Sequence, residues 1–185
     1  GAFFLGPPLP LMGQLFVLAE LNGEIRLVAL DSQTGRQKWS QQLAHVDTYT
    51  ILRNRTRRLA GATPSYGDGV LVCPTSAGAV VAVDLSTRTL LWGNQYEPIP
   101  TPTRFGIPPS YQRRTNPGDR WIDSTVTVAG GTVLLTRVES NKLYCLDLLT
   151  GKPKWAPLQR KGDLAEMQYL AGVYEENAVF VGKHK

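Results

Sequence analysis

The fold is decided by residues 28–39, which read VALDSQTGRQKW. Two later segments repeat its spacing, with a Thr three residues after an Asp and a Trp eight residues after it. The three sets are Asp31, Thr34 and Trp39; Asp84, Thr87 and Trp92; and Asp147, Thr150 and Trp155. Because self-similarity at this length marks a repeated supersecondary unit, we expect three copies of one unit and the start of a fourth near residue 178.

Each copy predicts short β-strands. Two apolar runs rich in β-branched residues precede the Asp, and a hairpin turn separates them at Asn22-Gly23, Ala77-Gly78 or Ser140-Asn141. A further strand is expected before each copy, at Phe3 to Leu11, Ala60 to Tyr66, Trp121 to Val128 and Met167 to Val173. With the strand that carries the Trp, each unit has four strands, which is the architecture of a β-propeller blade.

The Asp-x-x-Thr-Gly segment predicts a tight turn. The Asp side chain accepts backbone N–H groups, and Gly35 or Gly151 takes a positive φ. In the second copy this position is Arg88. A bulky residue with a positive φ costs about 1–2 kcal/mol, so we expect that turn either to differ from the others or to be less ideal.

The sequence therefore predicts an all-β fold of four-stranded antiparallel blades in an incomplete ring. The conserved spacing places each Trp on the outermost strand, where it is expected to be fully buried between neighbouring blades. The expected boundaries are blade 1 at about 3–43, blade 2 at about 60–95, blade 3 at about 121–158 and the start of blade 4 at about 167–185, with insertions at 44–59 and 96–120.

The segment Ala29 to Trp39, with its Ala-Leu-Asp-x-x-Thr-Gly-x-x-x-Trp pattern, resembles the repeat of PQQ-like (pyrroloquinoline quinone-type, WD40-like) β-propellers. The resemblance covers nearly the whole chain. It implies a periplasmic or extracytoplasmic location and a ring of seven or eight blades, so three and a half blades predict a fragment of a larger protein or a chain completed by another copy. The superfamily includes both quinone-dependent dehydrogenases and cofactor-free scaffolds, and fold alone does not choose between them.

The dehydrogenase alternative can be compared with the residues. The resemblance implies adjacent cysteines and a tryptophan around the quinone, with Glu, Asn and Asp holding calcium. Cys73 and Cys145 are not adjacent and lie at different offsets in their repeats, which favours two small buried hydrophobes. We therefore expect no catalytic residues, no metal site and no cofactor, with pyrroloquinoline quinone and calcium as the alternative.

The two insertions carry the chain's excess charge. They hold eight arginines and three acidic residues, which accounts for the whole net charge of +5. In an antiparallel blade, these connections emerge at the same end as the hairpin turns near Asn22, Gly78 and Asn141, and we call this end the loop face. The binding residues expected there are Arg53, Arg55, Arg57, Arg58, Arg104, Arg113, Arg114, Arg120, Tyr49 and Tyr111.

These observations predict a non-catalytic binding or scaffolding module that contacts its partner through an arginine-rich loop face. The expected partner is a protein or the remaining blades of a longer chain. Two alternatives stay open, a fragment of a quinone-dependent dehydrogenase and a polyanion-binding module. A homo-oligomer that completes the ring is a further alternative, whereas membrane insertion is not expected because no apolar run approaches about 20 residues.

Overall fold

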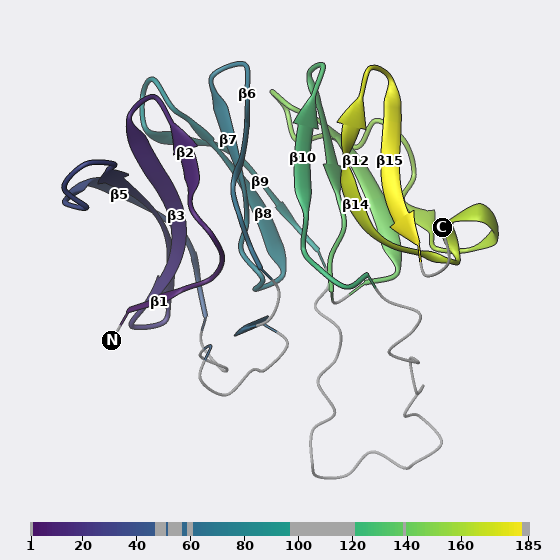
Figure 1. Cartoon of the computed structure of the whole chain (residues 1–185), viewed down its shortest axis with the longest axis horizontal. Helices are drawn as coiled ribbons and strands as arrows, with labels where there is room; N and C mark the ends of the chain where they lie inside the picture. Colours follow the sequence, from purple (N-terminus) through teal and green to yellow (C-terminus); the bar gives the residue numbers. More distant parts are fainter. Residues whose placement is uncertain are drawn as a thin grey trace, which may run out of the picture.

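The computed structural model describes residues 2–46, 51, 57–58, 61–96, 121–138 and 140–182. Within these ranges the strands form four antiparallel sheets, which stand side by side in chain order (Figure 1). Each of the first three sheets is a complete blade and the fourth has two strands. The predicted all-β fold of propeller blades in an incomplete ring is therefore confirmed.

The strands follow the chain from the inner to the outer edge of each blade. Blade 1 contains β1 (Ala2–Phe4), β2 (Leu9–Leu11), β3 (Gln14–Leu21), β4 (Glu24–Asp31) and β5 (Gln37–His45). Blade 2 contains β6 (Ser65–Gly67), β7 (Val70–Pro74), β8 (Ala79–Asp84) and β9 (Thr89–Gln95). Blade 3 contains β10 (Val126–Ala129), β11 (Thr132–Leu135), β12 (Lys142–Asp147) and β13 (Leu158–Gln159). After a 3-10 helix, η4 (Gly162–Leu164), blade 4 contains β14 (Met167–Tyr174) and β15 (Asn177–Gly182).

The innermost strands of blades 1, 2 and 3 are shorter than predicted, whereas that of blade 4, expected from Met167 to Val173, is present as β14. The strand expected from Phe3 to Leu11 is interrupted, and its two parts, β1 and β2, pair with opposite ends of β3. The interruption contains Pro7 and Pro8, which have no N–H group for a ladder hydrogen bond. In blades 2 and 3, the inner strands begin only at Ser65 and Val126.

The ends of the insertions lie beside the hairpin turns. The N–H of Val46, near the start of the first insertion, donates to the Gly23 carbonyl at 2.7 Å. The N–H of Tyr96, where the second insertion begins, donates to the Gly78 carbonyl at 2.8 Å. Both insertions therefore leave the blades at the end that carries the hairpin turns, as the sequence predicts.

The repeated Asp residues form the expected turns. In each copy, one carboxylate oxygen accepts the N–H of the residue three positions later at 2.9–3.0 Å. A hydroxyl within the turn donates to the same oxygen. Arg88 adopts φ +60°, close to the +68° of Gly35 and the +67° of Gly151. The second turn thus keeps the geometry of the others and accepts the strain of a bulky left-handed residue.

The same hydrogen bonds lower the pKa of the Asp31, Asp84 and Asp147 carboxyls. For Asp31 the largest cause is the backbone N–H of Thr34, followed by the ammonium of Lys38, which lies 3.1 Å from Oδ2. Each of these turns is therefore most stable when its carboxyl is ionised.

We expect Asp31→Asn to flatten the acid dependence of stability. A carboxyl whose pKa is lower in the folded state stabilises the fold above its unfolded pKa of about 4, and this contribution is lost as the pH falls toward the folded-state pKa. Asparagine keeps an acceptor oxygen for Thr34 but does not titrate. Melting temperatures measured between about pH 6 and pH 2 should fall less for the variant, and parallel curves would contradict this account.

The core lies in the seams, which we define as the interfaces between neighbouring blades. One cluster of buried side chains joins blades 1 and 2 and includes Phe16, Leu27 and Leu71. A second cluster joins blades 2 and 3 and includes Val72 and Val133. Because each blade is one sheet thick, it buries these apolar faces only against its neighbours.

The repeated tryptophans pack across the seams. The indole N–H of Trp92 in blade 2 donates to the Leu148 carbonyl of blade 3 at 2.7 Å. Its ring lies so close to Gly151 that a Cβ there would be 2.5 Å from Cδ2. The equivalent Trp39 in blade 1 packs edge-on against Phe16, and the Arg88 guanidinium of blade 2 lies 5.7 Å from its ring centroid.

Two details of the tryptophan prediction are wrong. Trp39, Trp92 and Trp155 are each partly exposed rather than fully buried, because they lie near the outer rim of the blades. Trp155 also precedes β13 instead of lying on an outer strand. The chain there forms an isolated bridge between Leu146 and Pro153, which moves the outer strand further along the sequence.

We expect Gly151→Ala to destabilise the protein more than Gly35→Ala. Both glycines have nearly the same positive φ, but a Cβ at Gly35 meets no atom within 4 Å, whereas one at Gly151 clashes with Trp92. Backbone strain should cost each variant roughly 1–2 kcal/mol, and overpacking should cost Gly151→Ala about 1–3 kcal/mol more. Urea unfolding measures both, and equal losses would contradict the seam contact.

Candidate functional site

The structure describes two of the ten residues expected to bind at the loop face. Arg58 is exposed, and Arg57 is buried. The other eight, which lie outside the described residues, are Arg53, Arg55, Arg104, Arg113, Arg114, Arg120, Tyr49 and Tyr111. The description of the loop face therefore rests on the hairpin turns, the ends of the insertions and residues 51, 57 and 58.

Arg57 is not available to a partner. It is 4% exposed, its Nη2 donates to Oε2 of Glu20 at 2.7 Å, and its Nε donates to the Ser76 carbonyl at 2.9 Å. Glu20 lies on β3 of blade 1, and Ser76 precedes the β7–β8 hairpin turn of blade 2. The prediction that Arg57 is an exposed binding residue is wrong, because a buried carboxylate draws its guanidinium into the first seam.

Glu20 is the residue that sequence reasoning missed. It is 3% exposed and accepts a second hydrogen bond, from the N–H of Ile51 at 2.9 Å. Its two oxygens therefore bind two points of the first insertion to blade 1. The sequence did contain a signal, because Glu20 directly follows the apolar run Leu15 to Ala19 and so lies on a strand expected to be buried. A carboxylate is rarely buried unless it is paired, so a basic partner could have been expected.

We expect Glu20→Ala to cost about 3–5 kcal/mol, because it removes the carboxylate that pairs with the buried Arg57 guanidinium. The matched control is Glu24→Ala, whose partner Arg26 lies 2.6 Å away in a pair that is about one third exposed. That loss should stay below about 1 kcal/mol. Chemical denaturation measures both free energies of unfolding.

A double variant separates the charge effect from the packing effect. Glu20→Met with Arg57→Met removes both charges at similar volume, so it should recover most of the stability that Glu20→Ala loses. The account of the Glu20–Arg57 pair fails if Glu20→Ala costs no more than Glu24→Ala.

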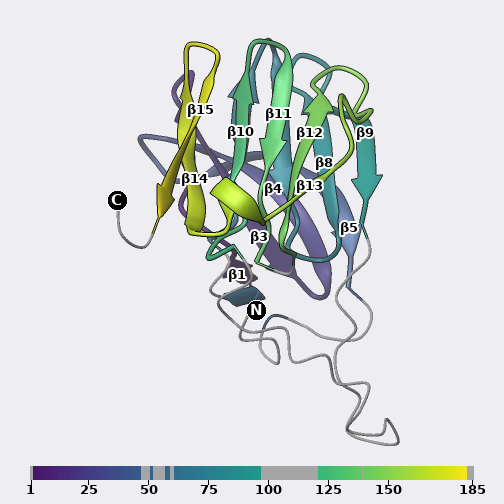
Figure 2. The ribbon, with the colours of Figure 1, turned by 90° about the vertical axis from the view of Figure 1, so that its right-hand side faces the viewer.

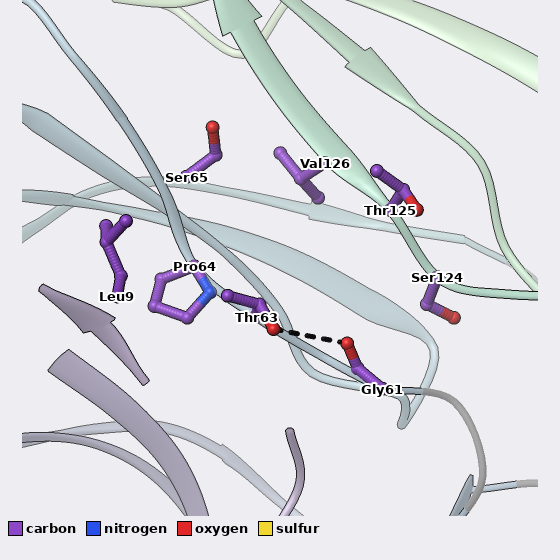
Figure 3. A pocket seen from close by; sticks show the side chains of 8 residues that line it. All are labelled: Leu9, Gly61, Thr63, Pro64, Ser65, Ser124, Thr125 and Val126. Atoms are coloured by element: carbon purple, nitrogen blue, oxygen red, sulfur yellow. Dashed lines mark hydrogen bonds between the residues drawn. The ribbon is translucent and has the colours of Figure 1, made fainter. Parts of the chain in front are cut away.

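A hollow of about 280 Å³ lies where the inner strands of three blades meet (Figure 3). Its lining residues are Leu9, Gly61, Thr63, Pro64, Ser65, Ser124, Thr125 and Val126. Three hydroxyls in this lining make hydrogen bonds with the backbone. The Thr63 hydroxyl donates to the Gly61 carbonyl. The hydroxyls of Ser65 and Ser124 each accept a hydrogen bond from a backbone N–H group. These contacts join the inner strands to one another and to nearby turns.

The cysteines lie in different blades. Cys73 is on β7 and Cys145 is on β12, and both are buried. Burial raises the pKa of both thiols, so both remain protonated near neutral pH. Their positions match the interpretation as buried hydrophobes, and neither lies in the hollow.

Asp123 is a further titratable residue that the sequence did not single out. It is half-buried beside Ser124, and burial raises the pKa of its carboxyl, while the hydroxyls of Thr125 and Thr136 act in the opposite direction. Among the described residues, no group of three His, Cys, Asp or Glu side chains is placed to hold a metal ion. The same part of the chain contains no helix that is long and apolar enough to cross a membrane.

Solved structures share this fold. BamB from Moraxella catarrhalis aligns with a TM-score of 0.53 and 19% identity, over 82% of this chain and 37% of its own. The computationally designed protein Ika8 aligns with a TM-score of 0.55 and 12% identity, over 97% of this chain and 43% of its own. The chain thus spans less than half the length of either protein.

A europium-containing methanol dehydrogenase aligns with a TM-score of 0.49 and 17% identity, over 85% of this chain and 26% of its own, which is too distant a likeness to bear on function. A search of curated proteins found no match. The family model described as outer membrane protein assembly factor BamB matches residues 1–104, which is more than half of the chain. Together with the repeated blades, this match shows that the chain belongs to the PQQ-like β-propeller family of BamB.

Proposed function

We propose that this chain is a non-catalytic binding module whose loop face docks an acidic surface of a protein partner. Membership of the BamB family supports a scaffold, since that family is described by its part in outer membrane protein assembly. It also supports an extracytoplasmic location. The proposal concerns the part of a propeller that this chain represents, because the chain spans 37% of the Moraxella BamB structure.

The Glu20–Arg57 pair is the observation that carries the proposal. It anchors the first insertion at Ile51 and Arg57 to blade 1, and Arg57 also contacts blade 2 through the Ser76 carbonyl. The exposed Arg58 directly follows one of these two buried points, which restricts the geometry of its backbone. Because less conformational entropy is then lost on binding, such a surface suits recognition of a partner.

Charge favours an acidic partner. The insertions account for the net charge of +5, and Arg58, next to the buried Arg57, is exposed. Arginine pairs with carboxylates through a planar set of donors, which gives geometric specificity as well as attraction.

The experiment compares a loop-face variant with a matched control. In the loop-face variant, Ser replaces four arginines of the insertions, namely Arg53, Arg55, Arg58 and Arg104. In the control variant, Ser replaces four basic residues that lie in or after the repeated Asp turns, namely Arg36, Lys38, Lys152 and Lys154. Arg57 is left intact because it is structural. The probes are poly-L-glutamate, heparin, and pyrroloquinoline quinone with calcium, each measured by titration calorimetry.

We expect poly-L-glutamate to bind the unmodified chain and the control, and to bind the loop-face variant at least tenfold more weakly. Equal weakening in both variants would mean that net charge alone drives binding and would contradict a loop-face site. Strong preference for heparin would favour the polyanion alternative instead. Uptake of one quinone per chain would overturn the non-catalytic proposal in favour of the dehydrogenase alternative.

A further inference from the structure

A second buried arginine lies in the seam between blades 2 and 3. Arg137 follows β11 and is 2% exposed. Its guanidinium carbon lies 3.5 Å from the ring centroid of Tyr96, at the end of blade 2, and 4.3 Å from that of Tyr144 on β12. Aromatic rings attract a cation, so these two contacts hold the guanidinium in place.

The charge of Arg137 is not neutralised within the described part of the chain. Its Nη2 donates to the hydroxyl of Tyr144, but Nε and Nη1 are buried without an acceptor. The ion pairs in which both partners are described residues join Arg26 to Glu24, Lys38 to Asp31 and Arg57 to Glu20, and none of them includes Arg137. A buried cation without a counter-ion is costly, and this cost favours binding of an anion.

The neighbouring seam provides an internal comparison. Arg57 is buried to a similar degree, at 4% exposure against 2% for Arg137. Its charge is met by the Glu20 carboxylate at 2.7 Å, and its Nε donates to a backbone carbonyl. The two arginines thus lie in adjacent seams, and among the described residues a carboxylate pairs with Arg57 but not with Arg137.

Arg137 also lies at the loop-face end of its blade. The Ser140 N–H donates to the Arg137 carbonyl at 3.0 Å, which places the arginine at the β11–β12 hairpin turn. The N–H of Tyr96, whose ring contacts Arg137, donates to the Gly78 carbonyl in the corresponding turn of blade 2. Arg137 and Tyr96 are therefore both held beside hairpin turns at the loop-face end of this seam.

We propose that Arg137, with Tyr96 and Tyr144, forms an anion site that takes a carboxylate. The carboxylate comes from a small organic acid or from an acidic side chain. It accepts hydrogen bonds from Nε or Nη1 of Arg137, much as the Glu20 carboxylate accepts one from Nη2 of Arg57. Both nitrogens are shielded, so binding requires local opening of the seam and is slower than diffusion. The site needs neither the loop arginines nor a protein partner, and it goes beyond the proposed function.

The test uses the full chain and measures its melting temperature in sodium acetate against sodium chloride at equal ionic strength. Acetate at 100 times its Kd should raise the melting temperature by about 5–10 °C. Arg137→Met, which keeps the side-chain bulk but removes the charge, should show no acetate-specific rise. No rise in the unmodified chain, or an equal rise in the variant, would overturn the proposal.

A second measurement needs no variant. In a ¹⁵N NMR titration with acetate, the Nε–H signal of Arg137 should shift, and that of Arg57, whose Nε already donates to the Ser76 carbonyl, should not. Unchanged Arg137 signals would overturn the proposal. The same titration with an acetyl-glutamate amide in place of acetate distinguishes the two sources of the carboxylate. Binding of the amide without binding of acetate would indicate that the site takes an acidic side chain of a protein.

The chain's own acids provide the last control. Glu97 and Glu139 are close to Tyr96 and Arg137 in the sequence. If acetate shifts the melting temperature only after Glu97→Gln and Glu139→Gln are introduced, the chain already neutralises Arg137 and the proposed site does not exist. A shift in the unmodified chain supports the site.

Discussion

Packing of one blade against the next is the constraint on which the rest of the structure depends. A single blade has two apolar faces and no interior, so its buried residues become a core only when a neighbour covers them. The contact of Trp92 with Leu148 and Gly151 shows how the repeat achieves this. The tryptophan of one copy packs on the Asp turn of the next, so the spacing that defines the repeat also sets the register between blades.

The same seams position the charged groups on which the proposed functions rest. The Glu20–Arg57 pair uses the first seam to hold an insertion that carries four arginines. Arg137 occupies the second seam between two tyrosines. In both places a buried charge lies at the loop-face end of an otherwise apolar interface. The blade interfaces therefore support the fold and also place buried charges at its loop-face end.

Local features of this fold could be predicted from the sequence, whereas contacts between distant residues could not. The Asp31 turn follows from its own residues, and Arg88 takes the same turn because the surrounding strands impose it. One strand was expected from Phe3 to Leu11, although the missing N–H donors of Pro7 and Pro8 could have indicated the break. Glu20 and Arg57 are 37 residues apart, and no local pattern shows that a loop arginine turns inward to meet a strand carboxylate.

The central claim is that buried contacts at the first seam anchor the first insertion at Ile51 and Arg57. Native-state hydrogen exchange of the Ile51 amide tests it most directly, because this N–H donates to Glu20 rather than to a strand. The account predicts that the Ile51 amide exchanges as slowly as the amides of β3, which open only when the seam opens. Exchange at the rate of an unfolded peptide, with β3 still protected, would contradict it.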